Sequence, residues 1–279
     1  MTTMDLRPRA RRLVAAPWRI GADSATVAHR NLLNIARTPG SQVTGIVQPV
    51  MFVLLLAFVF GGSLGGQEYR EFLIGGIFAQ TLLFNSSFTA VGLANDLQKG
   101  LVERYRSLPM ARIAPILGRT LSDLVTSTVS IVVIAVCGVL IGWRIEGGLG
   151  DAVLAFALLI LFAFAISWVG AFIGVAARSV EVAQSLGLIW LFPAAFISGA
   201  FVSISAMPAP LAVIAEWNPV TAIAFAVRDL FGNTPPPGME QPAGLPAASP
   251  VLYATLCSIA IIAVFAPLAL NRFMRITRG

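Results

Sequence analysis

Six long apolar stretches dominate this sequence and limit the folds that the chain can adopt. The hydrocarbon core of a bilayer is about 30 Å thick, so a helix that crosses it needs about 20 mostly apolar residues. The stretches lie at residues 43–64, 72–94, 116–142, 152–176, 182–205 and 250–270. The sequence therefore predicts an all-α, polytopic membrane protein with six transmembrane helices.

Charged residues are too few for a protein of this size that folds in water. Asp, Glu, Lys and Arg make up 11% of the 279 residues, whereas a typical soluble domain carries about 25%. This excludes a soluble enzyme, a DNA-binding factor and a disordered tail. The net charge of +6 needs no nucleic-acid partner, because basic residues also flank the cytoplasmic ends of membrane spans.

The basic residues are divided unequally between the two sides of the expected spans. Arg70, Arg144 and Arg228 lie on one side, and the other sixteen of the 19 Lys and Arg residues lie on the opposite side. Since Lys and Arg accumulate in cytoplasmic loops, we expect both termini in the cytoplasm. Residues 1–42 then form a cytoplasmic N-terminal segment, and residues 43–279 form a single six-span domain.

The N-terminal segment contains an amphipathic pattern at residues 25–37. Ala28, Leu32 and Ile35 recur at helical spacing, with polar side chains around the other side. Such a helix lies along the cytoplasmic membrane surface, and residues 38–40 are expected to end it. A solvated leader is the alternative.

The residue inventory argues against chemistry carried out by this chain itself. Lys99 is the sole lysine and Gly100 follows it, so the Gly-Lys-Ser/Thr of a phosphate-binding Walker A loop is absent from the sequence. His29 alone cannot form a two-histidine metal site. Cys137 and Cys257 lie in apolar runs, where cysteine behaves as a small hydrophobic side chain. We expect no catalytic residue, no metal site and no cofactor bound by this chain.

The loop between the second and third expected spans, residues 95–112, contains an expected amphipathic helix that Pro109 ends. A short charged amphipathic helix can press into a groove of a partner protein. A solvated loop that only sets topology is the alternative. The residues expected to contact a partner are Leu97, Lys99, Gly100, Leu101, Glu103, Arg104, Tyr105 and Arg106.

The segment between the fifth and sixth expected spans, residues 206–249, is expected on the outer side. Asn218 is a good N-cap and Pro219 suits the first helical position, while Gly232 is a suitable stop. These signals predict two short apolar helices that enter the outer leaflet without crossing it. A proline-rich external loop follows them.

Few polar side chains lie deep in the expected spans. Gln80, Asn85 and Ser87 of the second span are nearest the midplane; they either hydrogen-bond between helices or line a pathway for a mostly apolar molecule. Arg119 and Asp123 form an i, i+4 pair at the cytoplasmic edge of the third span. This pair is either a structural ion pair or part of a gate.

Two further classes of membrane protein fit the sequence poorly. An ion-coupled secondary transporter needs ionisable groups near the midplane, and no charged residue lies near the centre of any expected span. An intramembrane enzyme needs paired carboxylates, or a nucleophile with a base, inside a span. The energy for transport is therefore expected from outside the membrane, with ATP hydrolysis on a partner as its natural source.

Several motifs carry a family resemblance: residues 192–202, Met207-Pro208, residues 216–222 with Arg228, and, around the inner loop, Lys99-Gly100, Leu108-Pro109 and Gly118-Arg119. Together they resemble the membrane subunits of ABC type-2 exporters, and among these the daunorubicin-resistance-type drug permeases.

The resemblance implies a permease of the bacterial cell membrane with residues 95–112 as its coupling-helix loop. Its implied partners are a second permease, as a homodimer or a heterodimer, and two copies of a separate ATP-binding subunit that carries ATP and Mg. Export of hydrophobic drugs or lipid-like molecules is the implied function. Export of a cell-envelope polysaccharide or glycolipid is the alternative within the same superfamily.

Overall fold

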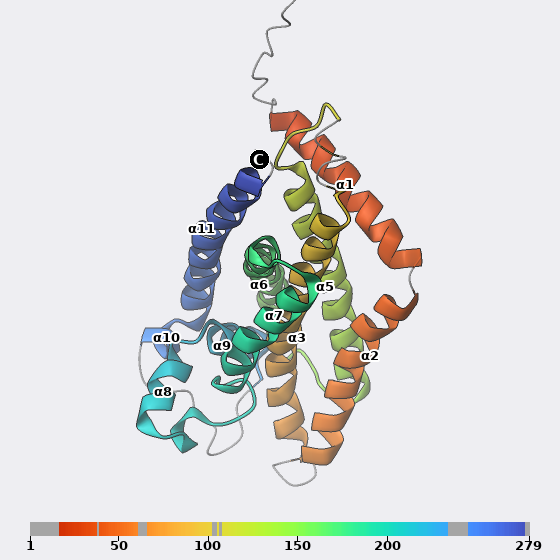
Figure 1. Ribbon diagram of the computed structural model, residues 1–279. Helices are drawn as coiled ribbons and strands as arrows, with labels where there is room; N and C mark the ends of the chain where they lie inside the picture. Colours follow the sequence, from red (N-terminus) through yellow and green to blue (C-terminus); the bar gives the residue numbers. More distant parts are fainter. Residues whose placement is uncertain are drawn as a thin grey trace, which may run out of the picture.

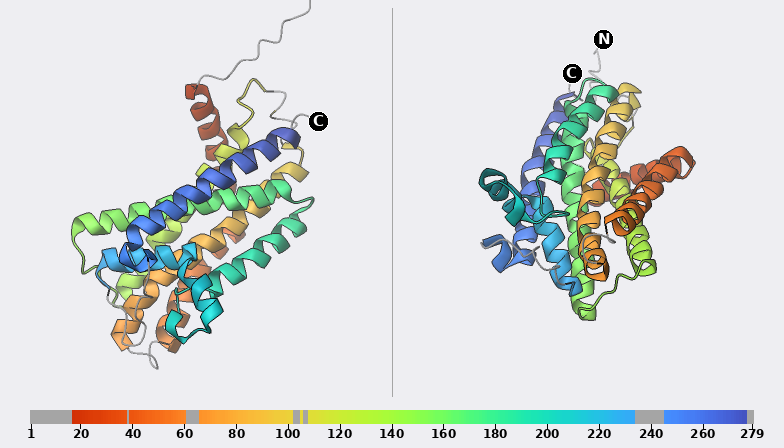
Figure 2. Two further views of the ribbon diagram at one scale, coloured as in Figure 1. Left: turned by 90° about the vertical axis from the view of Figure 1, so that its left-hand side faces the viewer. Right: turned by 90° about the horizontal axis from the view of Figure 1, so that it is seen from below.

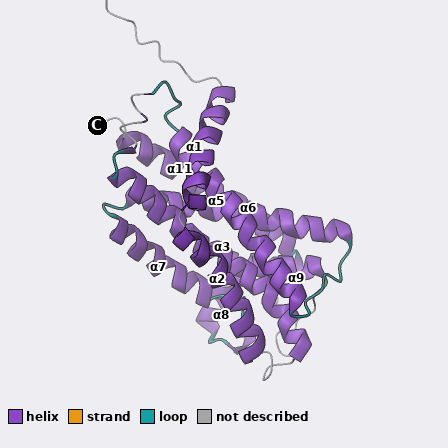
Figure 3. Ribbon diagram, turned by 90° about the vertical axis from the view of Figure 1, so that its right-hand side faces the viewer, coloured by secondary structure: helices purple, strands orange, loops and turns teal. Residues whose placement is uncertain are grey.

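The computed structural model describes residues 17–37, 39–60, 66–101, 105, 108–233 and 245–276. Within these ranges every regular element is a helix (Figure 3), so the expected all-α fold is confirmed. The N-terminal half contains α1 (Pro17–Arg37), α2 (Pro39–Leu55), the π-helical turn η1 (Leu56–Phe60), α3 (Gly66–Gln98) and α5 (Ala114–Leu140). The C-terminal half contains α6 (Leu149–Ala176), α7 (Val180–Phe196), the 3-10 turn η2 (Ile204–Ala206), α8 (Ala209–Glu216), α9 (Pro219–Phe231), α10 (Leu245–Ala248) and α11 (Pro250–Ile276).

Helix α3 lies at the centre of the bundle and contacts α5, α6, α7 and α9, while α11 packs along α6 (Figures 1 and 2). We call one end of the bundle the α1 end; it carries α1, the C-terminal end of α3 and the N-terminal end of α5, at the top of Figure 1. The opposite end, with the start of α3, the α5–α6 loop, α8 and α9, is the α9 end.

Four described helices are long and apolar enough to cross a membrane: Tyr69–Gln98, Ala114–Leu140, Leu149–Ala176 and Pro250–Ile276. They correspond to the second, third, fourth and sixth expected spans. A fifth crossing is added if α8 and α9, which meet at an angle of 64°, count as one broken span. Within the described residues, length and hydropathy therefore support four or five crossings rather than the six expected.

The other two expected spans appear as shorter apolar helices, Ile46–Val59 and Val180–Phe196. The second of these ends nine residues before the expected limit at 205 for a physical reason. The side chain of Asn218 donates hydrogen bonds to the carbonyl oxygens of Ala194 and Ile197, and Arg228 donates to those of Gly199 and Ala200. Carbonyls satisfied by distant side chains leave the backbone free to turn out of the helix.

Glycines of α6 allow its close approach to the central helix α3. A Cβ added at Gly170 would lie 2.2 Å from the carbonyl oxygen of Ser86, and one added at Gly174 would lie 2.6 Å from that of Ala90. The two glycines form a G-x-x-x-G motif, the spacing that lets transmembrane helices pack backbone to backbone. This motif holds α3 and α6 together nearer to the α1 end than to the α9 end.

Helix α1 is the amphipathic helix expected in the N-terminal segment, and it ends at Arg37 as predicted. It packs on α5 through Val27 and Ala28, both buried. The contact is close, because a Cβ added at Gly118 of α5 would lie 2.6 Å from the Cβ of Val27. The helix is therefore attached to the bundle along one face and leaves its other side exposed.

Candidate functional site

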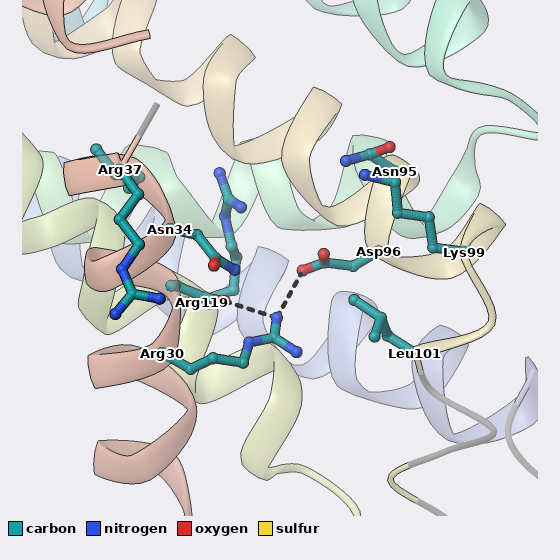
Figure 4. Close-up of a pocket in the computed structure, with 10 residues that line it drawn as sticks. Arg30, Asn34, Arg37, Asn95, Asp96, Lys99, Leu101 and Arg119 are labelled. Atoms are coloured by element: carbon teal, nitrogen blue, oxygen red, sulfur yellow. Dashed lines mark hydrogen bonds and ion pairs between the residues drawn. The ribbon is translucent and has the colours of Figure 1, made fainter. Parts of the chain in front are cut away.

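Three helices meet at the α1 end around a pocket of about 730 Å³. Figure 4 shows side chains from α1, from the end of α3 and from the start of α5 around it. Its lining residues are Arg30, Asn31, Asn34, Ile35, Arg37, Asn95, Asp96, Lys99, Leu101 and Arg119. The pocket therefore joins the N-terminal helix to the loop expected to contact a partner.

Arg30 of α1 is the residue that connects these elements. Its Nη2 lies 3.8 Å from the Oδ2 of Asp96 on α3 and donates a hydrogen bond of 2.8 Å to the Oδ1 of Asn31. Its guanidinium carbon lies 5.4 Å from the ring centroid of Tyr105 in the loop. A displacement of the loop would therefore alter contacts of both α1 and α3.

The loop itself begins later than the sequence suggested. Helix α3 continues to Gln98, past the expected end of the second span at residue 94, and Leu97 packs on an apolar cluster that includes Leu93 and Ile116. Lys99 and Gly100 form the turn that ends the helix, and Gly100 takes a left-handed φ of 65° there. Leu97 therefore belongs to the bundle rather than to a separate docking helix.

Of the other residues expected to contact a partner, only some lie in the part of the chain that the structure describes. Leu101 and Tyr105 are in helical conformation, and Leu101 faces the pocket. Glu103, Arg104 and Arg106 lie outside the described residues. Just before α5 begins, the Ala111 N–H donates a hydrogen bond of 2.8 Å to the Oδ2 of Asp23 on α1. The sequence did not predict this contact.

The expected Arg119–Asp123 pair forms in α5. The Nε of Arg119 donates to the Oδ2 of Asp123 over 3.1 Å, and both side chains are largely buried. The Nη2 of Arg119 also donates over 3.1 Å to the carbonyl oxygen of Phe88, and its guanidinium lies where a Cβ on Gly92 would be. These contacts tie α5 to α3 and favour the structural interpretation of the pair.

The three polar residues expected near the midplane face different neighbours. The Nδ2 of Asn85 lies 3.2 Å from the Oγ of Ser127 and 3.4 Å from that of Ser130, both on α5. Ser87 contacts α7 instead, where a Cβ on Gly187 would lie 3.2 Å from its Oγ, and Gln80 is buried in α3. Asn85 thus makes the interhelical hydrogen bonds that were one of its two expected uses.

At the α9 end, the expected cap of α9 is confirmed. The Oδ1 of Asn218 accepts a hydrogen bond of 2.9 Å from the Val220 N–H, Pro219 occupies the first helical turn, and Gly232 ends the helix with a φ of 75°. Through its Nδ2 the same asparagine also fixes the end of α7. One side chain therefore sets the boundaries of two helices.

Arg228 of α9 is the main residue whose structural role the sequence did not predict, because it was counted as an outer basic residue and as part of a family motif without any assigned contact. It is 1% exposed and donates hydrogen bonds to the carbonyl oxygens of Phe72, Gly199 and Ala200. Its guanidinium carbon also lies 3.5 Å from the ring centroid of Phe72. An arginine inside a 13-residue helix that is apolar apart from Thr221 and Asp229 was the available signal, since a buried charge must find partners.

A second set of hydrogen bonds at the same end connects the α5–α6 loop to the residue that follows the cap of α9. The Nε1 of Trp143 donates over 2.8 Å to the Oδ1 of Asn233, and the Nδ2 of Asn233 donates over 3.0 Å to the carbonyl oxygen of Arg144. In the part of the chain that the structure describes, no group of three His, Cys, Asp or Glu side chains is placed to hold a metal ion. The arrangement is that of a helical membrane protein, with long apolar helices, a charged pocket at one end and a hydrogen-bonded network at the other.

Comparison with known proteins defines the class further. Residues 24–231 match the family described as ABC-2 type transporter, and this chain belongs to that family. It is a multi-pass permease subunit of the bacterial cell membrane, not a catalytic subunit, and membership implies an ATP-binding partner subunit.

Among its relatives is the daunorubicin resistance ABC transporter permease protein DrrB1 of Streptomyces coeruleorubidus, 31% identical over 261 residues. The matched region covers 92% of this chain and 88% of that relative. The probable doxorubicin resistance ABC transporter permease protein DrrC of Mycobacterium tuberculosis is 23% identical over 214 residues, which cover 74% of this chain and 76% of that relative.

Proposed function

We propose that this chain is the permease of an exporter that moves hydrophobic drugs or lipid-like molecules across the cytoplasmic membrane. Two copies of a separate ATP-binding subunit, which hold ATP and Mg, supply the energy, and a second permease, identical or related, completes the assembly. The observation that carries the proposal is the similarity over 92% of the chain to a permease named for daunorubicin resistance.

The interior of the bundle supports an apolar substrate. Between the Arg119–Asp123 pair and Arg228, the polar side chains buried on α3 and α5 are uncharged, among them Gln80, Ser86 and Ser127. Uncharged walls favour an apolar molecule over an ion, because a buried charge needs a partner of opposite sign. We propose that Gln80, Asn85 and Ser87 line the pathway of the transported molecule and offer it hydrogen-bonding groups, in addition to the interhelical bonds of Asn85.

The arrangement of charges supports a six-span topology with the α1 end in the cytoplasm. The four long helices would cross the membrane together with α2–η1 and α7, and α8 and α9 would enter the outer leaflet. Arg30, Arg37, Lys99 and Arg119 gather around one pocket, as expected for a cytoplasmic end. Arg144 and Arg228 both lie at the other end.

The loop 95–112 would act as the coupling element. It continues from α3, it contacts Arg30 of α1 through Tyr105, and it is tied to Asp23 just before α5 begins. A partner that displaces the loop therefore acts on three helices at once. This is the geometry required if ATP hydrolysis on a separate subunit drives motion in a chain without an ATPase of its own.

Transport itself is tested in proteoliposomes that contain the permease with its ATP-binding subunit. We expect ATP-dependent accumulation of daunorubicin against its gradient, and no ATP-dependent movement of a hydrophilic sugar. Uphill transport by the permease alone, driven only by an imposed proton or sodium gradient, would contradict the proposal. ATP-dependent export of a glycolipid in place of the drug would support the alternative substrate class.

Docking is tested with Leu101→Pro. Gly100, the residue before Leu101, takes a left-handed φ of 65°. Proline removes the N–H of residue 101 and disfavours the α region for the residue before it, so we expect the turn that leads from α3 into the loop to change. We expect the variant to insert normally but to lose co-purification of the ATP-binding subunit and drug-stimulated ATP hydrolysis. If co-purification and transport both survive, the loop is not the docking element.

The matched control is Leu149→Pro at the α9 end. Leu149 is exposed and is the first residue of α6, a position where proline is tolerated. We expect this variant to match the unmodified permease in co-purification, ATP hydrolysis and transport. The same substitution at the two ends then separates a local effect on docking from a general effect of proline.

A further inference from the structure

We propose that the pocket at the α1 end binds the phosphate headgroup of an anionic phospholipid from the cytoplasmic leaflet, and that this lipid regulates coupling. The inference rests on the proposed orientation, in which the α1 end faces the cytoplasm. It concerns a ligand other than the exported molecule and a site other than the transport route.

The charge of the pocket favours an anion. Four cationic side chains line it, those of Arg30, Arg37, Lys99 and Arg119, against one carboxylate, that of Asp96. The charge of Arg30 is balanced only by Asp96, at 3.8 Å, and the charge of Arg119 is balanced by Asp123. Among the described residues neither Arg37 nor Lys99 has an ion-pair partner. Figure 4 shows Arg37 and Lys99 on opposite sides of the Arg30–Asp96 contact.

Buried donors in the pocket point to an oxygen-rich ligand. Asn31 is 4% exposed, and its Nδ2 has no acceptor among the described residues, although its Oδ1 accepts from Arg30. The Nε of Arg30 is also buried without an acceptor in the described part of the chain. Buried polar groups are rarely left unpaired, and a phosphate supplies several oxygens that could accept both donors.

The outer surface of α1 favours a lipid as the source of that phosphate. Trp18 is 69% exposed and Leu33 is also exposed on this helix, and Arg19 lies against the Trp18 ring. Tryptophan and arginine side chains at a membrane boundary lie at the level of the headgroups. Basic pockets between helices on the cytoplasmic side bind lipid headgroups, and the apolar side chain of Ile35 on the pocket wall suits an adjacent acyl chain.

A lipid held there would connect α1 to the ends of α3 and α5. Lys99 and Leu101 belong both to the pocket and to the coupling loop, so an occupied pocket would hold the loop in one position relative to the bundle. We therefore expect anionic lipid to increase ATP hydrolysis and transport by the complete exporter.

Binding is measured by native mass spectrometry of the purified permease after incubation with phosphatidylglycerol or phosphatidylcholine. We expect retained phosphatidylglycerol and no retained phosphatidylcholine. Glycerol 3-phosphate, the soluble headgroup chemistry, is added as a competitor. If it displaces the lipid at equal concentration, the pocket recognises a free phosphate ester rather than a lipid, and the inference is overturned.

Two variants locate the site. Asn31→Asp keeps the oxygen that accepts from Arg30 but replaces the free donor by a carboxylate, so we expect about tenfold weaker lipid retention. Arg37→Gln removes one cation and is expected to weaken retention about fivefold, since each basic residue near an anionic surface contributes about 1 kcal/mol. The matched control, Arg178→Gln, removes the same charge from the exposed loop between α6 and α7, outside the pocket, and should leave retention unchanged. Equal losses in all three would indicate a diffuse surface effect and would overturn the inference.

The outcome for the lipid site can be distinguished from the outcome for the proposed substrate. Retention in detergent requires neither transport nor the ATP-binding subunit, so an exporter of a different substrate would still show it. Conversely, a complex that pumps daunorubicin equally well with and without phosphatidylglycerol, and whose permease retains none, would keep the proposed function and refute the lipid site.

Discussion

The two ends of the molecule hold their charged residues in different ways. At the α1 end, Arg30 and Asp96 approach to 3.8 Å with side chains 33% and 21% exposed, beside an open pocket. At the α9 end, Arg228 is buried and donates to carbonyl oxygens on two separate segments. The first arrangement can be rearranged by a partner, because water replaces lost contacts. The second cannot, because its polar groups would be left unpaired in an apolar interior.

This difference suggests a division of labour in which motion enters at the α1 end, while the α9 end keeps its internal hydrogen bonds and moves as one unit. It predicts that equivalent substitutions at the two ends have unequal consequences. Those at the α9 end should reduce stability, and those at the α1 end should reduce coupling.

The largest effect is expected for Arg228→Met. The substitution leaves the carbonyl oxygens of Phe72, Gly199 and Ala200 without donors, so we expect a loss of about 3 kcal/mol in the free energy of unfolding. Thermal unfolding of the purified permease in detergent measures it. Arg228→Lys should recover part of the loss, since lysine keeps the charge but not the planar fork.

Arg144→Met is the control, because Arg144 is exposed at the same end and its guanidinium donates only to the nearby carbonyl oxygens of Val139 and Trp143. We expect it to unfold close to the temperature of the unmodified protein. Equal unfolding temperatures for Arg228→Met and Arg144→Met would show that the buried network does not fix the α9 end.

A smaller effect is expected from a pair of glycine substitutions on α3. A Cβ on Gly76 would lie 2.1 Å from the backbone oxygen of Ala200, whereas one on Gly92 would lie 2.1 Å from the guanidinium of Arg119. The backbone of Ala200 cannot move aside, whereas the end of the Arg119 side chain can. Gly76→Ala should therefore lower the free energy of unfolding by about 2 kcal/mol, and Gly92→Ala should lower it by less. Gly92→Ala displaces Arg119 and should lower drug-stimulated ATP hydrolysis instead.

Unfolding and ATP hydrolysis are therefore measured on both glycine variants. The comparison between the ends fails if Gly92→Ala is the less stable of the two, or if Gly76→Ala alone impairs coupling at temperatures where it is folded.

The smallest effect is expected for Asp96→Asn at the α1 end. Because the pair with Arg30 is long and partly exposed, its loss should change the free energy of unfolding by about 0.5 kcal/mol. Salt should abolish the difference, since exposed charges are screened. Unfolding of both proteins at low and high salt measures this, and a loss comparable to that of Arg228→Met would mean that the two ends are held alike.

Hydropathy and local capping rules predicted much of this architecture. The four longest helices follow from apolar length, the start of α9 follows from Asn218 and Pro219, and the Arg119–Asp123 pair follows from its spacing. Each of these features depends on residues close in the sequence. ATP hydrolysis on a partner was expected because no charged residue lies near the centre of an expected span, and the motifs that resemble a family specified a separate ATP-binding subunit.

The features that were missed depend on contacts between distant segments. Helix α7 ends at Phe196, where Asn218 and Arg228 bind carbonyl oxygens at and just beyond its last turn. Pro193 and Ser198-Gly199 were local signals for an end there, but the bonds from distant side chains were not predictable from the sequence. Helix α3 continues to Gln98 because Leu97 is covered by other helices, although the polar residues before it resembled a loop. The G-x-x-x-G motif of Gly170 and Gly174 was legible in the sequence, but its partner on α3 was not.

The position of that glycine contact along α3 determines how a displacement would be transmitted. At 1.5 Å per residue, the contact near residues 86–90 lies about 15 Å from Gln98 and about 33 Å from Gly66. A rigid rod that tilts about such a fulcrum moves its long arm roughly twice as far as its short arm. One ångström of travel imposed on the short arm at Gln98 would thus arrive as about two ångströms at Gly66. In the proposed orientation, this leverage would work in the outward direction, from the side where a nucleotide-driven partner would push.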